Sequence, residues 1–304
     1  MMDILSIKEL SKSFGTKMVL DNISFDVPEG SVFGFVGANG AGKTTTMKII
    51  LGLLTHDGGE IYVNGEKVHF GSAKTNRHIG FLPDVPEFYG YMRPKEYLRL
   101  CGEISGLDSA TNNRRGAELL EIVGLTKENK KISSFSRGMK QRLGVAQALL
   151  NEPKLLICDE PTSALDPIGR KEVLDILKQI RGKTTVVFST HILSDVERIC
   201  DRVAVLSGGS IALLGTLAEL RAKHKSDAIF IEFASLSDNG RFAAAAGSLM
   251  ENAVWEDTEL TLHVADVEKT QLEVLRILSS NSILPLKLEV LEPTIESLFL
   301  EVVV

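Results

Sequence analysis

A glycine-rich segment, residues 37–45, has the residue types and spacing of a phosphate-binding loop. It reads GANGAGKTT, follows the apolar run 32–36 and precedes a segment with apolar residues at helical spacing. Glycine allows backbone angles and close approaches that a Cβ would forbid, so successive N–H groups can face one phosphate at the start of a helix. We therefore predict a strand, loop and helix that bind a triphosphate. An ordinary glycine-rich turn is the alternative, and the full spacing with both flanking elements argues against it.

The individual residues of this loop suit different parts of a triphosphate. The Lys43 ammonium is expected to bridge the β- and γ-phosphates, the Thr44 hydroxyl to ligate Mg²⁺, and Thr45 to contact the α-phosphate. Backbone amides would supply the remaining contacts. Those amides belong to Gly37, Ala38, Asn39, Gly40, Ala41 and Gly42.

Paired carboxylates, Asp159 and Glu160, follow the apolar run 155–158, which is typical of a buried strand. Such a pair is a weak signal by itself. After a phosphate loop, however, it supplies the acid expected on the magnesium side of a nucleotide and a candidate base.

Two further polar residues stand where apolar strands end. Asp84 ends the apolar strand predicted over 79–84, and His191 follows the strand predicted over 185–189. A single histidine after a strand is more often a loop residue than a catalytic one, so its value depends on the residues near it.

The elements around these residues are predicted to form an α/β fold. Residues 4–27 alternate apolar and polar positions around a turn at 14–17, which favours antiparallel strands before the phosphate loop. Phe14, in that turn, is either a core residue or a ring placed to stack on adenine. Over about residues 92–150 helical periodicity dominates, which predicts an inserted helical subdomain. Its last helix begins at the segment 133–139, SSFSRGM, whose Ser and Gly are also common helix caps.

The composition is that of an ordinary globular protein, with 304 residues, 44% of them hydrophobic and 24% charged. No apolar run reaches the roughly 18 residues that cross a bilayer, and the first residues lack the basic region and apolar core of a signal peptide. We therefore expect a cytoplasmic location. Cys101, Cys158 and Cys200 are far apart and odd in number, which favours reduced thiols over a disulfide framework or a zinc site.

The C-terminal part of the chain differs in charge from the rest. From residue 226 onward there are 4 basic and 14 acidic side chains, a net charge of −10, whereas the remainder carries 30 basic and 26 acidic side chains. So acidic a segment is a poor electrostatic match for nucleic acid or anionic lipid, although a solvated acidic surface explains the excess equally well. We predict two domains, 1–222 and 223–304.

Periodicity in this tail predicts a small α/β domain of the split βαβ type. Strands are expected at 228–233, near 254–255, at 259–264 and at 286–290, and helices at 239–250, 266–279 and 294–303. No motif in it carries chemistry. We expect it to stabilise a dimer, with a regulatory role as the alternative.

Taken together, the motifs GANGAGKTT, FSRGM, LLICDE and SALD, followed by a histidine after the next strand, resemble the ATP-binding subunit of an ATP-binding cassette (ABC) transporter. The match spans roughly residues 4–225. The form SxGMxQR, with the run QRLGVAQALL, looks most like the subgroup that powers bacterial exporters of antibiotics, peptides or lipids, the bacitracin and daunorubicin resistance type. The resemblance implies a P-loop NTPase core with an antiparallel β subdomain and a helical subdomain, and ATP and Mg²⁺ as cofactors.

The resemblance also implies roles for individual residues. Phe14 would stack on adenine, and the loop 37–45 would cradle the phosphates. Asp159 would reach Mg²⁺ through water. Glu160 would be the base or orienter of the attacking water, and His191 would contact the γ-phosphate.

Two such subunits meet head to tail in this family, with two nucleotides between them. Ser136 and Gly138 would therefore bind the γ-phosphate of ATP held by the second subunit. Three positions depart from the common pattern. Arg137 and Met139 replace the first Gly and the Gln of the usual LSGGQ signature, and Asp84 stands where the family usually has Gln. Because Asp84 is shorter and anionic, we expect it to approach Mg²⁺ through water.

The resulting prediction is an ATPase subunit that drives a separately encoded export permease from the cytoplasmic face of the membrane, as a homodimer. The aromatic loop 88–92 would help to receive the permease's coupling segment, or would be an ordinary packed loop. The alternative function is a soluble ABC ATPase that acts on ribosomes or nucleic acid. Against it, the chain has a single phosphate loop, and Lys43 and Asp159 are only 116 positions apart with no sustained heptads. A scaffold without turnover is disfavoured by the presence of Glu160 and His191.

Overall fold

The computed structural model describes residues 3–223 and 228–291, which form two compact units. The first unit ends at Leu217 and the second begins at Ala218. The predicted domain boundary after residue 222 falls near the end of helix α7 (Leu217–Lys223). No helix in the described part of the chain has the length and apolar character that a membrane span requires.

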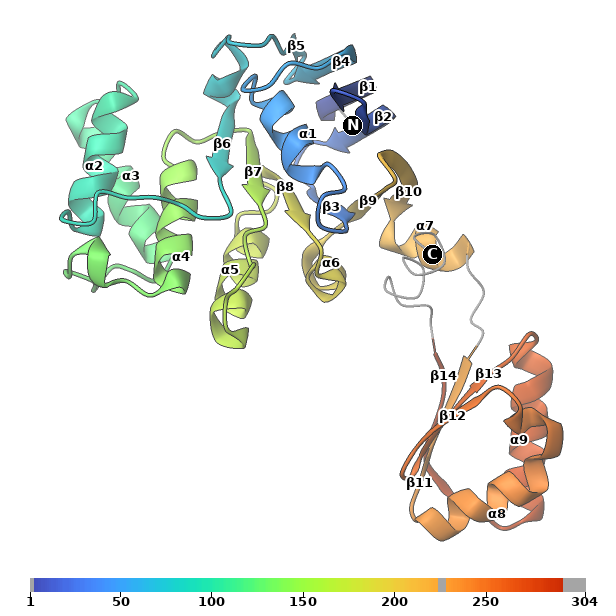
Figure 1. The fold of residues 1–304 in the computed structure, drawn as a ribbon. Coiled ribbons are helices and arrows are strands. Elements are labelled where there is room, and N and C mark those ends of the chain that lie inside the picture. Colours follow the sequence, from blue (N-terminus) through green and yellow to red (C-terminus); the bar gives the residue numbers. More distant parts are fainter. Residues whose placement is uncertain (1–2, 224–227, 292–304) are drawn as a thin grey trace. The chain divides into compact units, whose positions relative to one another are not determined.

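The first unit is built around a six-stranded sheet of order β10-β9-β3-β8-β7-β6 (Figure 1). Its strands are β3 (Val32–Gly37), β6 (Ile79–Leu82), β7 (Leu155–Asp159), β8 (Thr185–Thr190), β9 (Arg202–Ser207) and β10 (Ser210–Thr216). Neighbouring strands are parallel except β9 and β10. Every residue of β3, β7 and β8 is buried, as expected for parallel strands covered on both faces.

The parallel arrangement places the predicted site residues at one edge of this sheet. The phosphate loop follows β3, Asp84 follows β6, Glu160 follows β7 and His191 follows β8. Because the carboxyl ends of parallel strands lie at the same edge, residues far apart in the sequence meet there, which is where open α/β sheets bind ligands.

A second, antiparallel sheet of order β2-β1-β4-β5 confirms the strands predicted over residues 4–27. Its strands are β1 (Asp3–Phe14), β2 (Lys17–Pro28), β4 (Gly58–Val63) and β5 (Glu66–Lys67). Its buried side chains share one hydrophobic cluster with β3 and with helix α1 (Lys43–Ile50). This shared core fixes the start of α1, and therefore the loop that precedes it.

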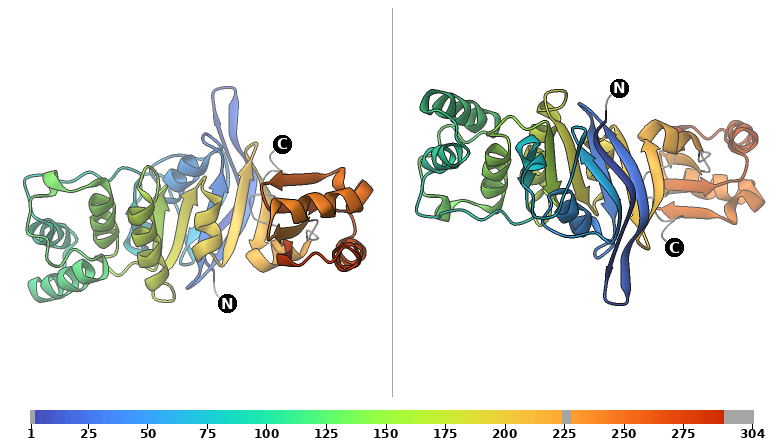
Figure 2. Two further views of the ribbon diagram at one scale, coloured as in Figure 1. Left: turned by 90° about the horizontal axis from the view of Figure 1, so that it is seen from below. Right: turned by 90° about the horizontal axis from the view of Figure 1, so that it is seen from above.

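Between β6 and β7 the described residues form the predicted helical subdomain. Its helices are α2 (Pro94–Ile104), α3 (Ser109–Ile122) and α4 (Arg137–Ala148), with a short 3₁₀ turn at Ile132–Ser134. Another 3₁₀ turn, Thr75–His78, lies outside this subdomain, directly before β6. The views in Figure 2 place α2 and α3 at the end of the unit beyond α4 and β6. Helices α5 (Pro167–Gln179) and α6 (Leu193–Ile199) complete this unit. The helix α4 begins where the motif SSFSRGM was expected to start one, since Ser136 caps it by accepting the Met139 N–H at 3.2 Å.

The second unit has the element order βαββαβ, which confirms the predicted split βαβ type. Its elements are β11 (Ala228–Phe233), α8 (Leu236–Ala246), the 3₁₀ turn Gly247–Met250, β12 (Ala253–Glu256), β13 (Glu259–His263), α9 (Val267–Ser280) and β14 (Pro285–Leu291). The strands are antiparallel in the order β12-β13-β11-β14.

One helix of this unit differs from the prediction. The helix expected at 239–250 begins at Leu236, because the Ser235 side chain accepts the Asp238 N–H at 3.2 Å and caps it there. It ends at Ala246, where Gly247 takes a positive φ of 52° and a 3₁₀ turn follows. The helix predicted over 294–303 lies outside the described residues.

Candidate nucleotide-binding site

A pocket of about 450 Å³ lies at the carboxyl edge of the central sheet, beside the phosphate loop. It brings together residues from the loop and from the ends of three other strands. Its lining is Val19, Asn39, Gly40, Gly42, Lys43, Thr44, Thr45, Asp84, Glu160, Ser163 and His191. The sequence analysis did not single out Val19, and it quoted Ser163 only as part of the motif SALD.

Several predicted residues lie outside this lining. Ala38 and Ala41 line a neighbouring hollow on the other side of the loop, together with Met18, and Gly37 ends β3. Ser136 and Gly138 lie at the start of α4. Their predicted contact with nucleotide therefore does not involve the pocket of their own chain.

Phe14 is not a core residue, which excludes one of its two predicted interpretations. Its side chain is 49% exposed at the turn between β1 and β2, and this hairpin projects from the unit in Figure 2. The Lys12 ammonium lies 5.3 Å from the centre of its ring. Stacking on adenine remains the prediction for this aromatic face.

The glycines of the loop are required by close packing as well as by backbone angles. Gly40 and Gly42 have φ of 82° and 114°. A Cβ on Gly42 would lie 2.7 Å from the Leu20 Cδ2, and one on Gly37 would lie 2.7 Å from the Leu206 carbonyl oxygen. The loop is thus pressed against neighbouring strands in a conformation that L side chains rarely adopt.

Lys43 folds back into the loop and is only 5% exposed. Its ammonium donates to the carbonyl oxygens of Gly37 at 2.7 Å and Ala38 at 3.2 Å, and lies 3.1 Å from Oε1 of Glu160. A positive charge is therefore held at the mouth of the loop by carbonyl dipoles and one carboxylate.

Glu160 is held between two cationic or potentially cationic groups. Its Oε1 contacts Lys43, and its Oε2 lies 2.8 Å from Nδ1 of His191, which donates when it carries a proton. The backbone of Glu160 has a φ of 49°, in the left-handed region that costs a non-glycine residue free energy. Residues held in this way cluster at functional sites, so the conformation supports a chemical role for this carboxylate.

Ser189 contacts the Asp159 carboxylate and the Glu160 backbone, and it was not among the predicted site residues. Its hydroxyl donates to Oδ1 of Asp159 at 2.6 Å and accepts the Glu160 N–H at 3.0 Å. Asp159 is 6% exposed and does not line the pocket. A hydroxyl at the end of an otherwise apolar strand was the available signal, but its pairing with Asp159 depends on the register of β7 and β8.

We expect Ser189→Ala to lower kcat for ATP hydrolysis roughly ten-fold, because a hydrogen bond to a charged group contributes about 1.5 kcal/mol. The Mg²⁺ concentration for half-maximal activity should rise at the same time, since Asp159 loses the donor that orients it. Titration of activity with Mg²⁺ at saturating ATP measures both effects. Thr185→Ala is the matched control, because it removes a buried hydroxyl from the other end of β8, where Thr185 accepts the Gly30 N–H at 2.9 Å. An unchanged Mg²⁺ dependence in Ser189→Ala would remove Ser189 from the site.

The residues present fit a magnesium ion that is bound together with phosphates. Mg²⁺ usually takes one or two protein ligands and keeps several waters, whereas a dedicated protein cage needs several side chains. Among the described residues no group of three or more His, Cys, Asp or Glu side chains is arranged to hold a metal. Thr44 lines the pocket and Asp159 lies behind it, which suits one direct and one water-mediated ligand.

The three cysteines take no part in this site. Cys101, Cys158 and Cys200 are unpaired. Burial raises the pKa of the Cys158 and Cys200 thiols, so both are protonated and unreactive.

Comparison with known proteins identifies the family of each part of the chain. Residues 20–163 match the family model described as ABC transporter, and residues 215–303 match the model described as ATP-binding protein DrrA1-3-like, C-terminal domain. The second match covers the unit whose fold was predicted to be of the split βαβ type.

Individual relatives are similar over much longer stretches. The linearmycin resistance ATP-binding protein LnrL of Bacillus subtilis (strain 168) is 36% identical over 98% of this chain and 97% of its own length. The bacitracin transport ATP-binding protein BcrA of Bacillus licheniformis is 38% identical over 79% of this chain and 78% of its own. Among solved structures, cbiO1 from Clostridium perfringens, described as part of the ABC transporter complex cbiONQ, superposes with a TM-score of 0.67 and 26% identity. That match covers 73% of this chain and 91% of cbiO1.

These matches confirm the family and the subgroup that the motifs indicated. The family matches show that the chain is an ATPase. The chain therefore belongs to the ABC transporter family, as an ATP-hydrolysing subunit of the bacitracin and drug exporter subgroup.

Proposed function

We propose that two copies of this chain hydrolyse two magnesium–ATP complexes held between them and so drive export through a separately encoded permease. The observation that carries the proposal is the single pocket in which Lys43, Glu160 and His191 converge from the ends of three strands. Lys43 supplies positive charge for the β- and γ-phosphates. Glu160 orients the attacking water and accepts its proton, and His191 contacts the γ-phosphate.

Mg²⁺, when bound, neutralises phosphate charge. On the protein side, Thr44 would hold it through its hydroxyl and Asp159 and Asp84 through water. Little covalent chemistry is needed from the chain itself, whose task is to hold a water in line and to provide fixed charges.

The need for a second copy is supported by the position of the signature segment. Ser136 is exposed and Gly138 is half-buried at the start of α4, and neither lines the pocket of its own chain. The N-terminus of a helix is a favourable place for an anion. We propose that this anion is the γ-phosphate of ATP on the second copy, and that the C-terminal unit stabilises the resulting dimer.

We propose that the aromatic loop 88–92 is the receiving surface for the permease; its residues Phe88 and Gly90 also line a groove beside α4. Phe88 packs edge-on against Tyr97, with ring centres 5.1 Å apart, whereas Tyr89 and Tyr91 are 55% and 71% exposed. Part of the aromatic loop is therefore packed, and part of it presents apolar rings to solvent, as a docking surface requires. Such docking would place the chain at the cytoplasmic face of the membrane.

Co-purification from native membranes, followed by identification of the bound membrane protein, tests this function. We expect a permease to be recovered with the wild-type chain and to be lost with the double variant Tyr89→Ser and Tyr91→Ser, while ATP hydrolysis by the free subunit persists. Phe70→Ser is the matched control, because Phe70 is 64% exposed on the same unit but lies between β5 and β6, outside the aromatic loop. Recovery of ribosomes or nucleic acid in place of a permease would favour the alternative function.

A further inference from the structure

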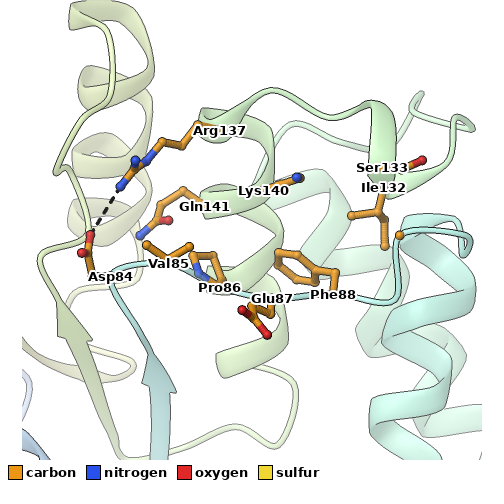
Figure 3. Close-up of a pocket in the computed structure, with 11 residues that line it drawn as sticks. Asp84, Val85, Pro86, Glu87, Phe88, Ile132, Ser133, Arg137, Lys140 and Gln141 are labelled. Carbon is orange, nitrogen blue, oxygen red and sulfur yellow. Dashed lines mark ion pairs between the residues drawn. The ribbon is translucent and has the colours of Figure 1, made fainter.

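The two charged departures from the family pattern contact each other. Nη2 of Arg137 lies 3.5 Å from Oδ1 of Asp84 (Figure 3). The Ser163 hydroxyl donates to the same oxygen at 3.0 Å. The pair is nearly half exposed on both sides, with side-chain exposures of 46% and 44%. Where the usual pattern has a neutral glutamine and a glycine, this chain has an ion pair.

Asp84 occupies a position between two hollows of the first unit. It lines the nucleotide pocket with Lys43 and Glu160, and it also lines the groove beside α4 with Arg137 and Gln141. Among the described residues it is the one shared by both linings. A change in the contacts of this carboxylate therefore alters the lining of both the nucleotide pocket and the groove.

Arg137 is in an electrostatically unfavourable place without Asp84. It is the first residue of α4, where the helix dipole is positive, and the first turn of α4 contains no acidic residue. Asp84 supplies from another element the negative charge that this turn lacks. The start of α4, with Ser136 and Gly138 on either side of Arg137, is in this way tied to the strand end that carries Asp84.

We propose that the Asp84–Arg137 pair is a latch between the nucleotide pocket and the signature segment of α4, in which a magnesium nucleotide competes with Arg137 for the Asp84 carboxylate. The inference rests on the proposed function, because it takes Asp84 to face Mg²⁺. Two cations beside one carboxylate repel each other, so binding of one weakens the attraction of the carboxylate for the other. By linkage the effect is reciprocal. If the Asp84–Arg137 ion pair lowers the affinity for the magnesium nucleotide, then binding of that nucleotide weakens the ion pair to the same extent. The freed Arg137 then adds a positive charge to the segment that meets the second copy.

Equilibrium binding of Mg–ADP to the full chain tests the latch without turnover, and without a γ-phosphate for the second copy to contact. We expect Arg137→Gln to bind Mg–ADP two- to five-fold more tightly than wild type, the range that corresponds to an exposed ion pair. Arg137→Lys, which keeps the charge, should restore wild-type affinity. In the Asp84→Asn background, Arg137→Gln should change nothing, and in the absence of Mg²⁺ the wild type and Arg137→Gln should bind ADP equally.

Arg99→Gln is the matched control, since it breaks another exposed arginine pair of the helical subdomain, with Glu103 at 2.8 Å, away from the pocket. Equal affinities of wild type and Arg137→Gln, or the same gain in the Asp84→Asn background, would overturn the latch. A different result would show that the nucleotide site itself is assigned wrongly. In that case Lys43→Ala would bind Mg–ADP as tightly as wild type. The two ideas are thus separated within one set of measurements.

Discussion

Replacing Glu160 by Gln is expected to lower the rate of ATP hydrolysis about 10²- to 10⁴-fold, the contribution typical of a positioned general base. The Glu160 carboxylate lies between the Lys43 ammonium and the His191 ring, and glutamine has the same shape but cannot accept the proton. Loss of the negative charge should leave Lys43 free for phosphate, so ATP binding is retained and the closed dimer is favoured. Phosphate release and equilibrium ATP binding measure the two effects separately.

The same substitution changes the side chain without changing the unusual backbone at this position. Glu160→Gln leaves the backbone contacts with Ser189 in place, so the left-handed conformation should persist and the variant should fold. Glu121→Gln, an exposed position on α3, is the control for the change of charge alone. Turnover at the wild-type rate in Glu160→Gln would assign the base to another residue.

Lys43→Ala is expected to weaken ATP binding roughly 10- to 100-fold. A hydrogen bond to a charged group contributes about 1.5–3 kcal/mol, and each 1.4 kcal/mol corresponds to a factor of ten in affinity. The loss should be large because Lys43 is 5% exposed and its ammonium is already oriented by two carbonyl oxygens, so no other cation can move into its place.

Equilibrium titration with ATP measures this affinity directly. Lys48→Ala is the matched control, because Lys48 is an exposed lysine on the same helix and does not line the pocket. Tight ATP binding by Lys43→Ala would contradict the assignment of the loop as a phosphate cradle. Hydrolysis by Lys43→Ala should fall as well, since the Glu160 carboxylate loses its lysine partner.

The Asp84–Arg137 pair explains how a chain of this family can depart from the usual pattern at two positions at once. Taken one at a time, a carboxylate in a pocket that is expected to hold phosphates and a cation in the first turn of a helix are each unfavourable. Placed 3.5 Å apart, they offset each other. The negative charge of Asp84 is therefore tolerated because Arg137 is present, and the positive charge of Arg137 because Asp84 is present.

The amino-acid sequence by itself determined the parts of this protein whose signals are local. The phosphate loop is recognisable because its glycines, Lys43 and Thr44 are neighbours in the chain, and the strand and helix beside it carry their own periodicity. The βαββαβ order of the second unit follows for the same reason. The start of α8 at Leu236 was missed because the Ser235 cap is a single side-chain contact that periodicity does not register.

The tertiary structure alone decided which of these residues meet. Ser189 reaches Asp159 because β7 and β8 pair in one particular register, and a shift by one residue would turn its hydroxyl to the other face of the sheet. Asp84 meets Arg137, 53 positions later, because the end of β6 lies beside the start of α4. Such contacts depend on how separate elements pack, and the spacing of residues along the chain does not predict the distances between packed elements.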